Sequence, residues 1–111
     1  MRIELLWWEG CPSYPEALHQ LRDILDEEGV LEEVDLVQVH DDEQARRERF
    51  QGSPTIRIDG EDLFPPGEGE GEPYSLTCRV YRLGDGRISP TPDPEHVRQA
   101  VRRRIHDAAD R

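Results

Sequence analysis

The first half of the chain alternates a strand-like segment, a helical segment and a second strand-like segment. Residues 2–8 form a dense apolar run without helical periodicity, which predicts a buried strand. Across residues 13–29 apolar side chains recur every three or four positions, which predicts a helix, and Ser13 and Glu16 have capping-box spacing. Residues 34–39 predict a second buried strand. Because a strand–helix–strand unit is parallel and right-handed by strong preference, this order restricts the chain to an α/β fold.

The second half of the sequence adds two strands and two helices to this unit. Residues 41–50 predict a short charged helix, and residues 53–60 predict a strand that starts at a proline and ends at a turn. Residues 75–83 predict a fourth strand, and residues 94–106, capped by Asp93, predict the last helix. We therefore expect a central four-stranded mixed sheet with helices on both faces, in the order β-α-β-α-β-β-α.

The length and the charge limit the possible classes of function. The 111 residues are expected to form one domain, 1–111, and residues 60–74 predict an acidic loop rich in glycine and proline. The net charge is −11 and every basic residue is arginine, so phosphate backbones and anionic membranes should repel the protein. No apolar run approaches the roughly 20 residues of a membrane helix, and the N-terminus lacks the apolar core of a signal peptide. We therefore expect a cytoplasmic protein that binds neither nucleic acid nor membranes.

The chain has two cysteines, Cys11 and Cys78, which are 67 positions apart. Two thiols are too few for a disulfide-dense scaffold or a closed zinc site. The histidines fall on separate predicted elements without the spacing of metal ligands, so we expect no metal site and no cofactor. These histidines are His19, His40, His96 and His106.

Cys11 lies in a turn between the first predicted strand and the first predicted helix. A thiolate near a helix N-terminus is stabilised by free N–H groups and by the helix dipole, so this position favours a reactive cysteine. Glu9 opposes ionisation, and no Lys, Arg or His lies within five residues of Cys11. The alternative is a small buried residue without reactivity.

Two motifs in this order of elements resemble motifs of the thioredoxin and glutaredoxin superfamily. Gly10-Cys11-Pro12-Ser13-Tyr14 stands where that family has its Cys-x-x-Cys motif. Gly52-Ser53-Pro54-Thr55 stands where the family has a cis-proline that faces the reactive sulfur. The resemblance covers residues 2–60 and 76–106, and the first motif is most similar to that of small bacterial thioredoxin-like proteins. Some such relatives carry selenocysteine at the first position, and some are labelled alkylmercury-lyase-like.

The resemblance implies a thioredoxin-like fold with a redox site built from these two motifs. Cys11 would be the attacking sulfur, and a cis bond before Pro54 would turn the Ser53 backbone toward it, where an extended partner chain could pair. The residues that would contact a substrate are Pro12, Ser13, Tyr14, Ser53, Pro54 and Thr55.

Tyr14 replaces the second cysteine of the family motif. Without that cysteine the site is monothiol, unless Cys78 or an outside thiol resolves the intermediate formed on Cys11. If residues 76–83 pair antiparallel with residues 55–59, Cys78 lies beyond the roughly 7 Å limit for a disulfide and packs as a small apolar residue. Tyr14 either offers its hydroxyl to the Cys11 sulfur or only packs.

Three functions remain open at this point. The first is a monothiol redox protein in which Cys11 attacks a disulfide, peroxide or persulfide, with a small thiol or a thiol or disulfide protein as partner. The second is a binder of soft metals or organomercurials that uses one or both thiolates. The third is a non-catalytic module that presents the strand edge at Pro54 to a partner.

Overall fold

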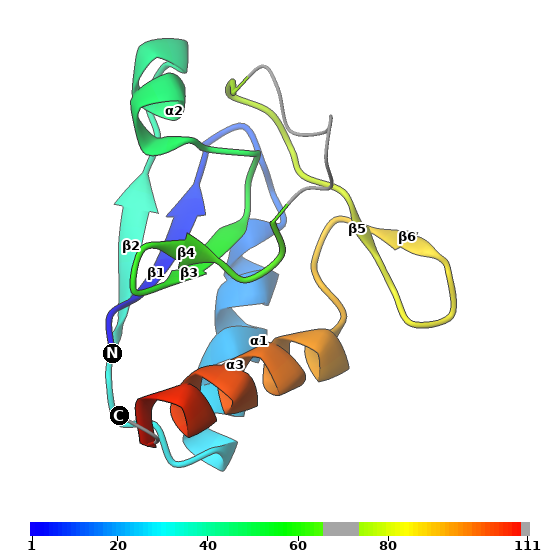
Figure 1. Cartoon of the computed structure of the whole chain (residues 1–111). Coiled ribbons are helices and arrows are strands. Elements are labelled where there is room, and N and C mark those ends of the chain that lie inside the picture. The colour runs from blue at the N-terminus through cyan, green and yellow to red at the C-terminus, as the bar shows by residue number, and fades with distance from the viewer. Residues whose placement is uncertain (66–73, 110–111) are drawn as a thin grey trace.

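Three helices and six strands make up the part of the chain that the computed structural model describes, residues 1–65 and 74–109 (Figure 1). The helices are α1 (Tyr14–Glu27), α2 (Asp42–Glu48) and α3 (Pro94–Ala109). The strands are β1 (Ile3–Trp7), β2 (Val34–Gln38), β3 (Thr55–Ile58), β4 (Glu61–Asp62), β5 (Tyr81–Arg82) and β6 (Ile88–Ser89). None of the helices in these two ranges is long and apolar enough to cross a membrane.

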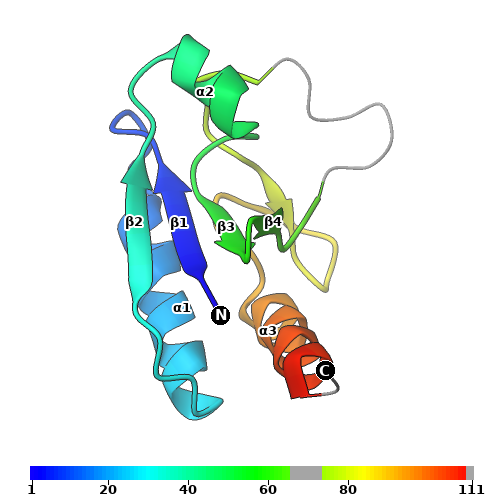
Figure 2. The ribbon, with the colours of Figure 1, turned by 60° about the vertical axis from the view of Figure 1, so that its left-hand side comes forward.

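β1 is an inner strand of a four-stranded mixed sheet with the order β2-β1-β3-β4 (Figure 2). β1 and β2 are parallel, with Leu5 opposite Leu36, which confirms the predicted strand–helix–strand unit. β3 runs antiparallel to β1 and places Thr55 opposite Leu6. The end of β1 and the start of β3 therefore lie side by side at one end of the sheet.

The predicted fourth strand over residues 75–83 is wrong, and so is the predicted order of elements. Asp59 and Gly60 both have positive φ, 53° and 82°, and they turn the chain directly into β4, which pairs with β3. β4 thus forms within the stretch predicted to be an acidic loop, of which residues 66–73 lie outside the described residues. Within residues 75–83 the strand β5 is only two residues long, and it pairs with β6 in a separate two-stranded sheet.

Helices cover both faces of the four-stranded sheet. Leu5 and Leu6 are adjacent in β1, so their side chains point to opposite faces. Leu5 packs in the larger core cluster with residues of α1, α3 and β3, and α1 also contacts α3 directly. Leu6 packs in a smaller cluster with Val39, Phe50 and Ala45 of α2. These two clusters confirm the predicted mixed sheet with a helical layer on each side.

α1 begins directly after Ser13, the predicted N-cap residue, but its N-terminus is capped differently from the prediction. Ser13 is the N-cap residue, yet its side chain makes no capping hydrogen bond, so the capping box predicted with Glu16 does not form. At the other end Gly29 has a φ of 74°, and the Val30 N–H donates to the Leu25 carbonyl at 2.8 Å. The helix therefore has a well-defined C-terminal end, and the Ser13 side chain is left for other partners.

Candidate functional site

Cys11 lies where the sequence predicts, in the turn between β1 and α1, and its side chain is buried. Only 1% of the residue is exposed. Its N–H donates to the Trp8 carbonyl at 3.0 Å, which closes the turn. A Cβ on Gly10 would lie 2.3 Å from the Trp8 ring, so any side chain at position 10 would require this ring to move. The Cys11 thiol donates to the Ser53 carbonyl oxygen at 3.3 Å.

The segment that leads into β3 faces this thiol. The Ser53–Pro54 peptide bond is cis, as the resemblance implies. Ser53, Pro54 and Thr55 are all buried, and the Thr55 hydroxyl donates to the Gly52 carbonyl. The structure therefore brings the two sequence motifs together, with the hydrogen bond from Cys11 to Ser53 as their direct link.

Cys78 lies beside the same site. The Ser53 N–H donates to the Thr77 carbonyl at 2.8 Å, and the Arg79 N–H donates to the Ser53 carbonyl at 2.9 Å. Ser53 and Cys78 thus form a parallel bridge. The Ser53 carbonyl accepts hydrogen bonds from both cysteine-bearing segments, since it is also the acceptor for the Cys11 thiol.

The strand pairing that would keep the two cysteines far apart does not form. Residues 76–83 were predicted to run antiparallel along β3. Instead, the chain of β4 pairs with β3 only as far as Ile56, whose carbonyl accepts a hydrogen bond from the Leu63 N–H at 2.9 Å. β4 therefore leaves the edge at Ser53 unpaired. Residues 77–79 pair at that open edge in the parallel direction, so Cys78 itself lies opposite Ser53.

Arg79 and Tyr81 fix residues 76–81, here called the Cys78 segment, against the sheet. The Arg79 guanidinium donates to the Asp62 carboxylate at 2.7 Å and lies over the Tyr81 ring, 4.9 Å from its centroid. The Tyr81 hydroxyl donates to the Pro54 carbonyl. Both side chains are largely buried, so these contacts hold the segment in one position relative to β3 and β4.

Gly52 allows the Cys78 segment to approach this closely. Its φ is 126°, which favours glycine, and a Cβ on it would lie 3.0 Å from the Arg79 backbone nitrogen. A larger side chain at this position would push the segment, and Cys78 with it, away from Ser53.

The two thiols shift each other's pKa in opposite directions. Burial alone raises the pKa of the Cys11 thiol. Hydrogen bonds that the ionised sulfur can accept from the backbone and side chain of Ser13 and from the side chains of Ser53 and Cys78 more than offset this, and they lower the pKa below its ordinary value. Desolvation raises the pKa of Cys78, and the adjacent Cys11 side chain raises it further. Cys11 is therefore the thiol that ionises first.

The Ser53 hydroxyl adds to the preference for a thiolate at Cys11. Ser53 is fully buried, and its hydroxyl has no hydrogen-bond partner of its own within residues 1–65 and 74–109. A buried polar group without a partner costs about 1–3 kcal/mol. Donation from this hydroxyl to the ionised sulfur gives it a partner, which is one of the contacts that lower the Cys11 pKa.

The remaining residues of the first motif lie at the start of α1. The Ser13 side chain does not cap the helix, and the backbone and side chain of Ser13 help to lower the pKa of Cys11. The Tyr14 ring stacks on Trp7, with the ring centroids 4.2 Å apart and the planes at 21°. This stacking favours the packing alternative for Tyr14. Pro12 is exposed on the outside of the turn.

The residues that position Cys78 have no motif by which the sequence could identify them. Arg79 and Tyr81 are turned inward, whereas Cys78 and Val80 are exposed, and this two-residue alternation is typical of a strand. The alternation indicates that the segment pairs with another chain segment. It contains no information about which edge receives the segment or in which direction.

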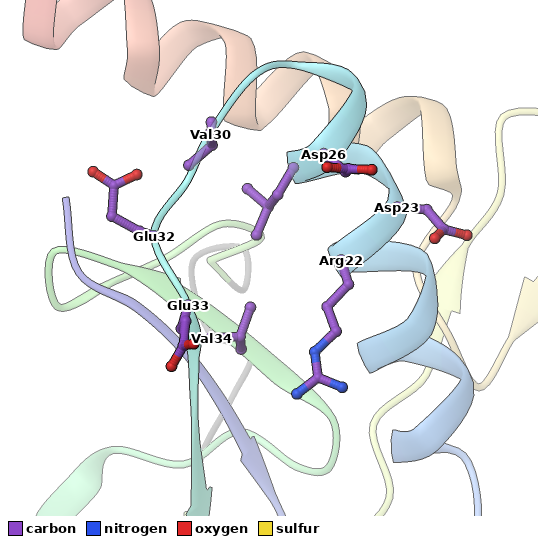
Figure 3. A pocket seen from close by; sticks show the side chains of 8 residues that line it. Arg22, Asp23, Asp26, Val30, Glu32, Glu33 and Val34 are labelled. Carbon is purple, nitrogen blue, oxygen red and sulfur yellow. The ribbon is translucent and has the colours of Figure 1, made fainter.

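A separate hollow lies at the other end of α1 from the two thiols (Figure 3). Its volume is about 520 Å³, and carboxylates dominate its polar lining. Within the described residues, no group of three or more His, Cys, Asp or Glu side chains is placed to hold a metal ion. Because none of its lining residues lies at either thiol, the hollow adds no group to the thiol site. Its charged lining residues are Arg22, Asp23, Asp26, Glu32 and Glu33.

No family model, no curated protein and no solved structure matches the chain. The geometry of the thiol site is therefore the basis for any assignment of function.

Proposed function

We propose that the protein is a thioredoxin-like thiol–disulfide redox protein whose working unit is the pair Cys11 and Cys78. One observation carries this proposal. Cys78 lies opposite Ser53 in a parallel bridge, and the carbonyl of the same Ser53 accepts the hydrogen bond from the Cys11 thiol. Two cysteines that are far apart in the sequence thus meet across a single residue, and each shifts the pKa of the other.

Three features support the thioredoxin-like part of the proposal. They are the parallel unit of β1, α1 and β2, a cysteine just before α1, and a cis-proline that leads into the antiparallel strand β3. In such an arrangement an extended chain can pair with the residue before the proline. Here residues 77–79 of the same chain do so. The Cys78 segment therefore occupies the place that the resemblance gives to a partner chain.

The proposed reaction is a two-electron thiol–disulfide exchange. The two protein thiols lose two protons and two electrons and form a Cys11–Cys78 disulfide, while an external disulfide takes up both and leaves as two thiols. Cys11 supplies the more acidic thiol, and Cys78 supplies the second sulfur that the tyrosine at position 14 cannot. A two-thiol cycle thus replaces the monothiol cycle that the motif around Tyr14 suggests.

A redox titration tests this proposal. The full chain is equilibrated in glutathione buffers of increasing oxidation, free thiols are alkylated, and the products are weighed by mass spectrometry. We expect one transition in which both thiols disappear together without added glutathione mass. The Cys11→Ser and Cys78→Ser variants should give only mixed disulfides with glutathione. A wild-type protein that also gives only mixed disulfides at every ratio would show that the two cysteines are not a redox pair.

A second candidate function uses the same two sulfurs as ligands for a soft cation. Thiolates select soft metals such as Cu(I), and mercuric ion is a suitable probe. The observation that favours this function is that the Cys11 thiol bonds to the Ser53 carbonyl while Cys78 lies opposite the same Ser53. Titration with mercuric ion should show one ion bound per chain, with a large loss of affinity in either cysteine-to-serine variant. Unchanged affinity in Cys78→Ser would contradict a two-thiolate site.

The Ser53 edge gives no support to a non-catalytic module that presents this edge to a partner. The backbone N–H and carbonyl of Ser53 are already bonded to Thr77 and Arg79. A partner strand would first have to displace the Cys78 segment, together with the buried side chains of Arg79 and Tyr81. We therefore do not propose this function.

A further inference from the structure

We infer that small thiols in solution exchange with the protein at Cys78, and that Cys11 is the internal sulfur that does not meet them directly. This inference rests on the proposed function and assigns the roles within the pair. It reverses the roles that the family resemblance implies, in which the cysteine before the first helix attacks the external partner.

The two sulfurs differ in access. Cys11 is buried, whereas Cys78 is exposed. The rate of thiol–disulfide exchange depends on which sulfur an incoming thiolate can reach. An external thiol therefore reaches Cys78 of the oxidised pair, and Cys11 is shielded from attack.

The anchors of the Cys78 segment hold it with Cys78 exposed. Arg79 and Tyr81 are turned inward, whereas Cys78 and Val80 are exposed, Val80 by 63%. Rotation of the segment onto its other face would break the ion pair between Arg79 and Asp62 and the hydrogen bond of Tyr81. The exposure of Cys78 is therefore a property of how the segment is anchored.

The pairing at Ser53 limits the class of exchange partner. An extended protein chain cannot pair there while the N–H and carbonyl of Ser53 are bonded to Thr77 and Arg79. A small thiol needs no such pairing, since it reaches the exposed sulfur through solvent. We therefore assign low-molecular-weight thiols of the size of cysteine or glutathione as the partners of this step.

The acidity of the two thiols supports the same direction of attack. In thiol–disulfide exchange, the sulfur with the lower thiol pKa leaves faster. The pKa of Cys11 lies below its ordinary value and that of Cys78 lies above it. Attack on Cys78 therefore expels the better leaving group, and attack on Cys11 would expel the poorer one.

The sequence of steps follows from these roles. A small thiolate attacks the Cys78 Sγ, a new sulfur–sulfur bond forms, and the Cys11–Cys78 bond breaks with its electron pair on the Cys11 Sγ. Cys11 leaves as a thiolate that Ser13 and Ser53 stabilise by hydrogen bonds. A second small thiolate attacks the small-thiol sulfur of the mixed disulfide, which releases a small disulfide and leaves Cys78 as a thiolate that takes up a proton. Oxidation of the protein runs through the same steps in reverse.

Peptide mapping of the trapped intermediate tests the inference. The full chain is oxidised to the intramolecular disulfide, treated briefly with glutathione, quenched in acid, unfolded and alkylated, and the modified peptides are identified by mass spectrometry. We expect glutathione on Cys78 and the alkyl group on Cys11. Glutathione mainly on Cys11 would overturn this assignment and leave the proposed pair intact. If no intramolecular disulfide forms in the first place, the proposed function fails and the assignment fails with it.

Single-cysteine variants give a second readout that does not depend on trapping. Reduced Cys11→Ser, which keeps only Cys78, should react with glutathione disulfide roughly tenfold or more faster than Cys78→Ser, because access outweighs acidity. The two rates should converge in denaturant, where both sulfurs are accessible, and circular dichroism reports whether each variant is folded. Faster reaction of folded Cys78→Ser would overturn the assignment.

Discussion

The turn that holds Cys11 and the segment that holds Cys78 are built in different ways. The turn is local, because a backbone hydrogen bond closes it and α1 begins directly after it. The Cys78 segment depends on one bridge to Ser53 and on the side chains of Arg79 and Tyr81, which bind residues far away in the sequence. The position of Cys11 should therefore tolerate distant substitutions. The position of Cys78 should change when a single anchor is lost.

Removal of the Arg79 side chain should have the largest effect on this difference. Arg79→Ala leaves Asp62, whose side chain is only 15% exposed, without its partner. We expect the free energy of unfolding to fall by about 2–4 kcal/mol. Because Cys78 is then held less firmly, the Cys11–Cys78 disulfide should require a more oxidising glutathione buffer. Chemical denaturation and redox titration measure the two effects.

Arg82→Ala is the matched control for this substitution. Arg82 is exposed and comes directly after the Cys78 segment. Its removal should change neither the free energy of unfolding nor the disulfide equilibrium by a measurable amount. Equal effects of the two substitutions would show that Arg79 is not an anchor.

Gly52→Ala should separate the Cys78 segment from Ser53. The positive φ and the 3.0 Å approach of the Arg79 nitrogen both oppose a side chain here, so we expect a loss of about 1–3 kcal/mol in the free energy of unfolding. Gly29→Ala is the control, because Gly29 has a positive φ of 74° but nothing within 4 Å of its Cβ position. Only Gly52→Ala should weaken the disulfide in the glutathione titration. A similar shift in both variants would rule out a specific role for the close approach at Gly52.

Tyr81→Phe should have an intermediate effect. It removes the buried hydrogen bond to the Pro54 carbonyl, which should cost about 1–2 kcal/mol in denaturation experiments. Tyr14→Phe is the comparison, because the phenyl ring can still stack on Trp7 and the stability should not change. The alkylation rate of Cys11 should also be the same in Tyr14→Phe. A changed rate would favour the alternative in which the Tyr14 hydroxyl contacts the sulfur.

The smallest expected effects concern the pH dependence of the reduced protein. Because the folded-state pKa of Cys11 is lowered, its ionisation stabilises the fold above the unfolded pKa, and this contribution is lost as the pH falls through the folded pKa. The pKa of Cys78 is raised, so its contribution is present below the unfolded pKa and is lost as the pH rises through the folded pKa. Denaturation of each single-cysteine variant, at pH values below and above the pKa of an unfolded cysteine, measures the two contributions separately.

Alkylation kinetics give a sharper readout of the contact between the thiols. The rate for Cys11 should inflect at a lower pH than the rate for an unfolded cysteine. Cys78→Ser replaces a side chain that lowers the Cys11 pKa, so the inflection should move to higher pH. An inflection that does not move would mean that the two side chains do not interact.

The sequence predicts the half of the site that depends on local patterns. The apolar run of β1 and the helical stripe of α1 follow from short patterns, the cis bond before Pro54 follows from the family resemblance, and Cys11 lies among these features. The meeting with Cys78 could not be predicted, because it depends on how far β4 covers the edge of β3. The tight turn at Asp59 and Gly60 sets where β4 begins, but a strand of two residues has no periodic signal that would show where it ends.

The disulfide map of the oxidised full chain tests most directly whether Cys11 and Cys78 form one redox unit. The protein is oxidised at low concentration, digested in acid without reduction, and its cross-linked peptides are identified by mass spectrometry. We expect one linked pair of peptides within a single chain, one with Cys11 and the other with Cys78. Two unlinked peptides that each carry their own adduct, or a link between the Cys78 residues of two chains, would contradict this result.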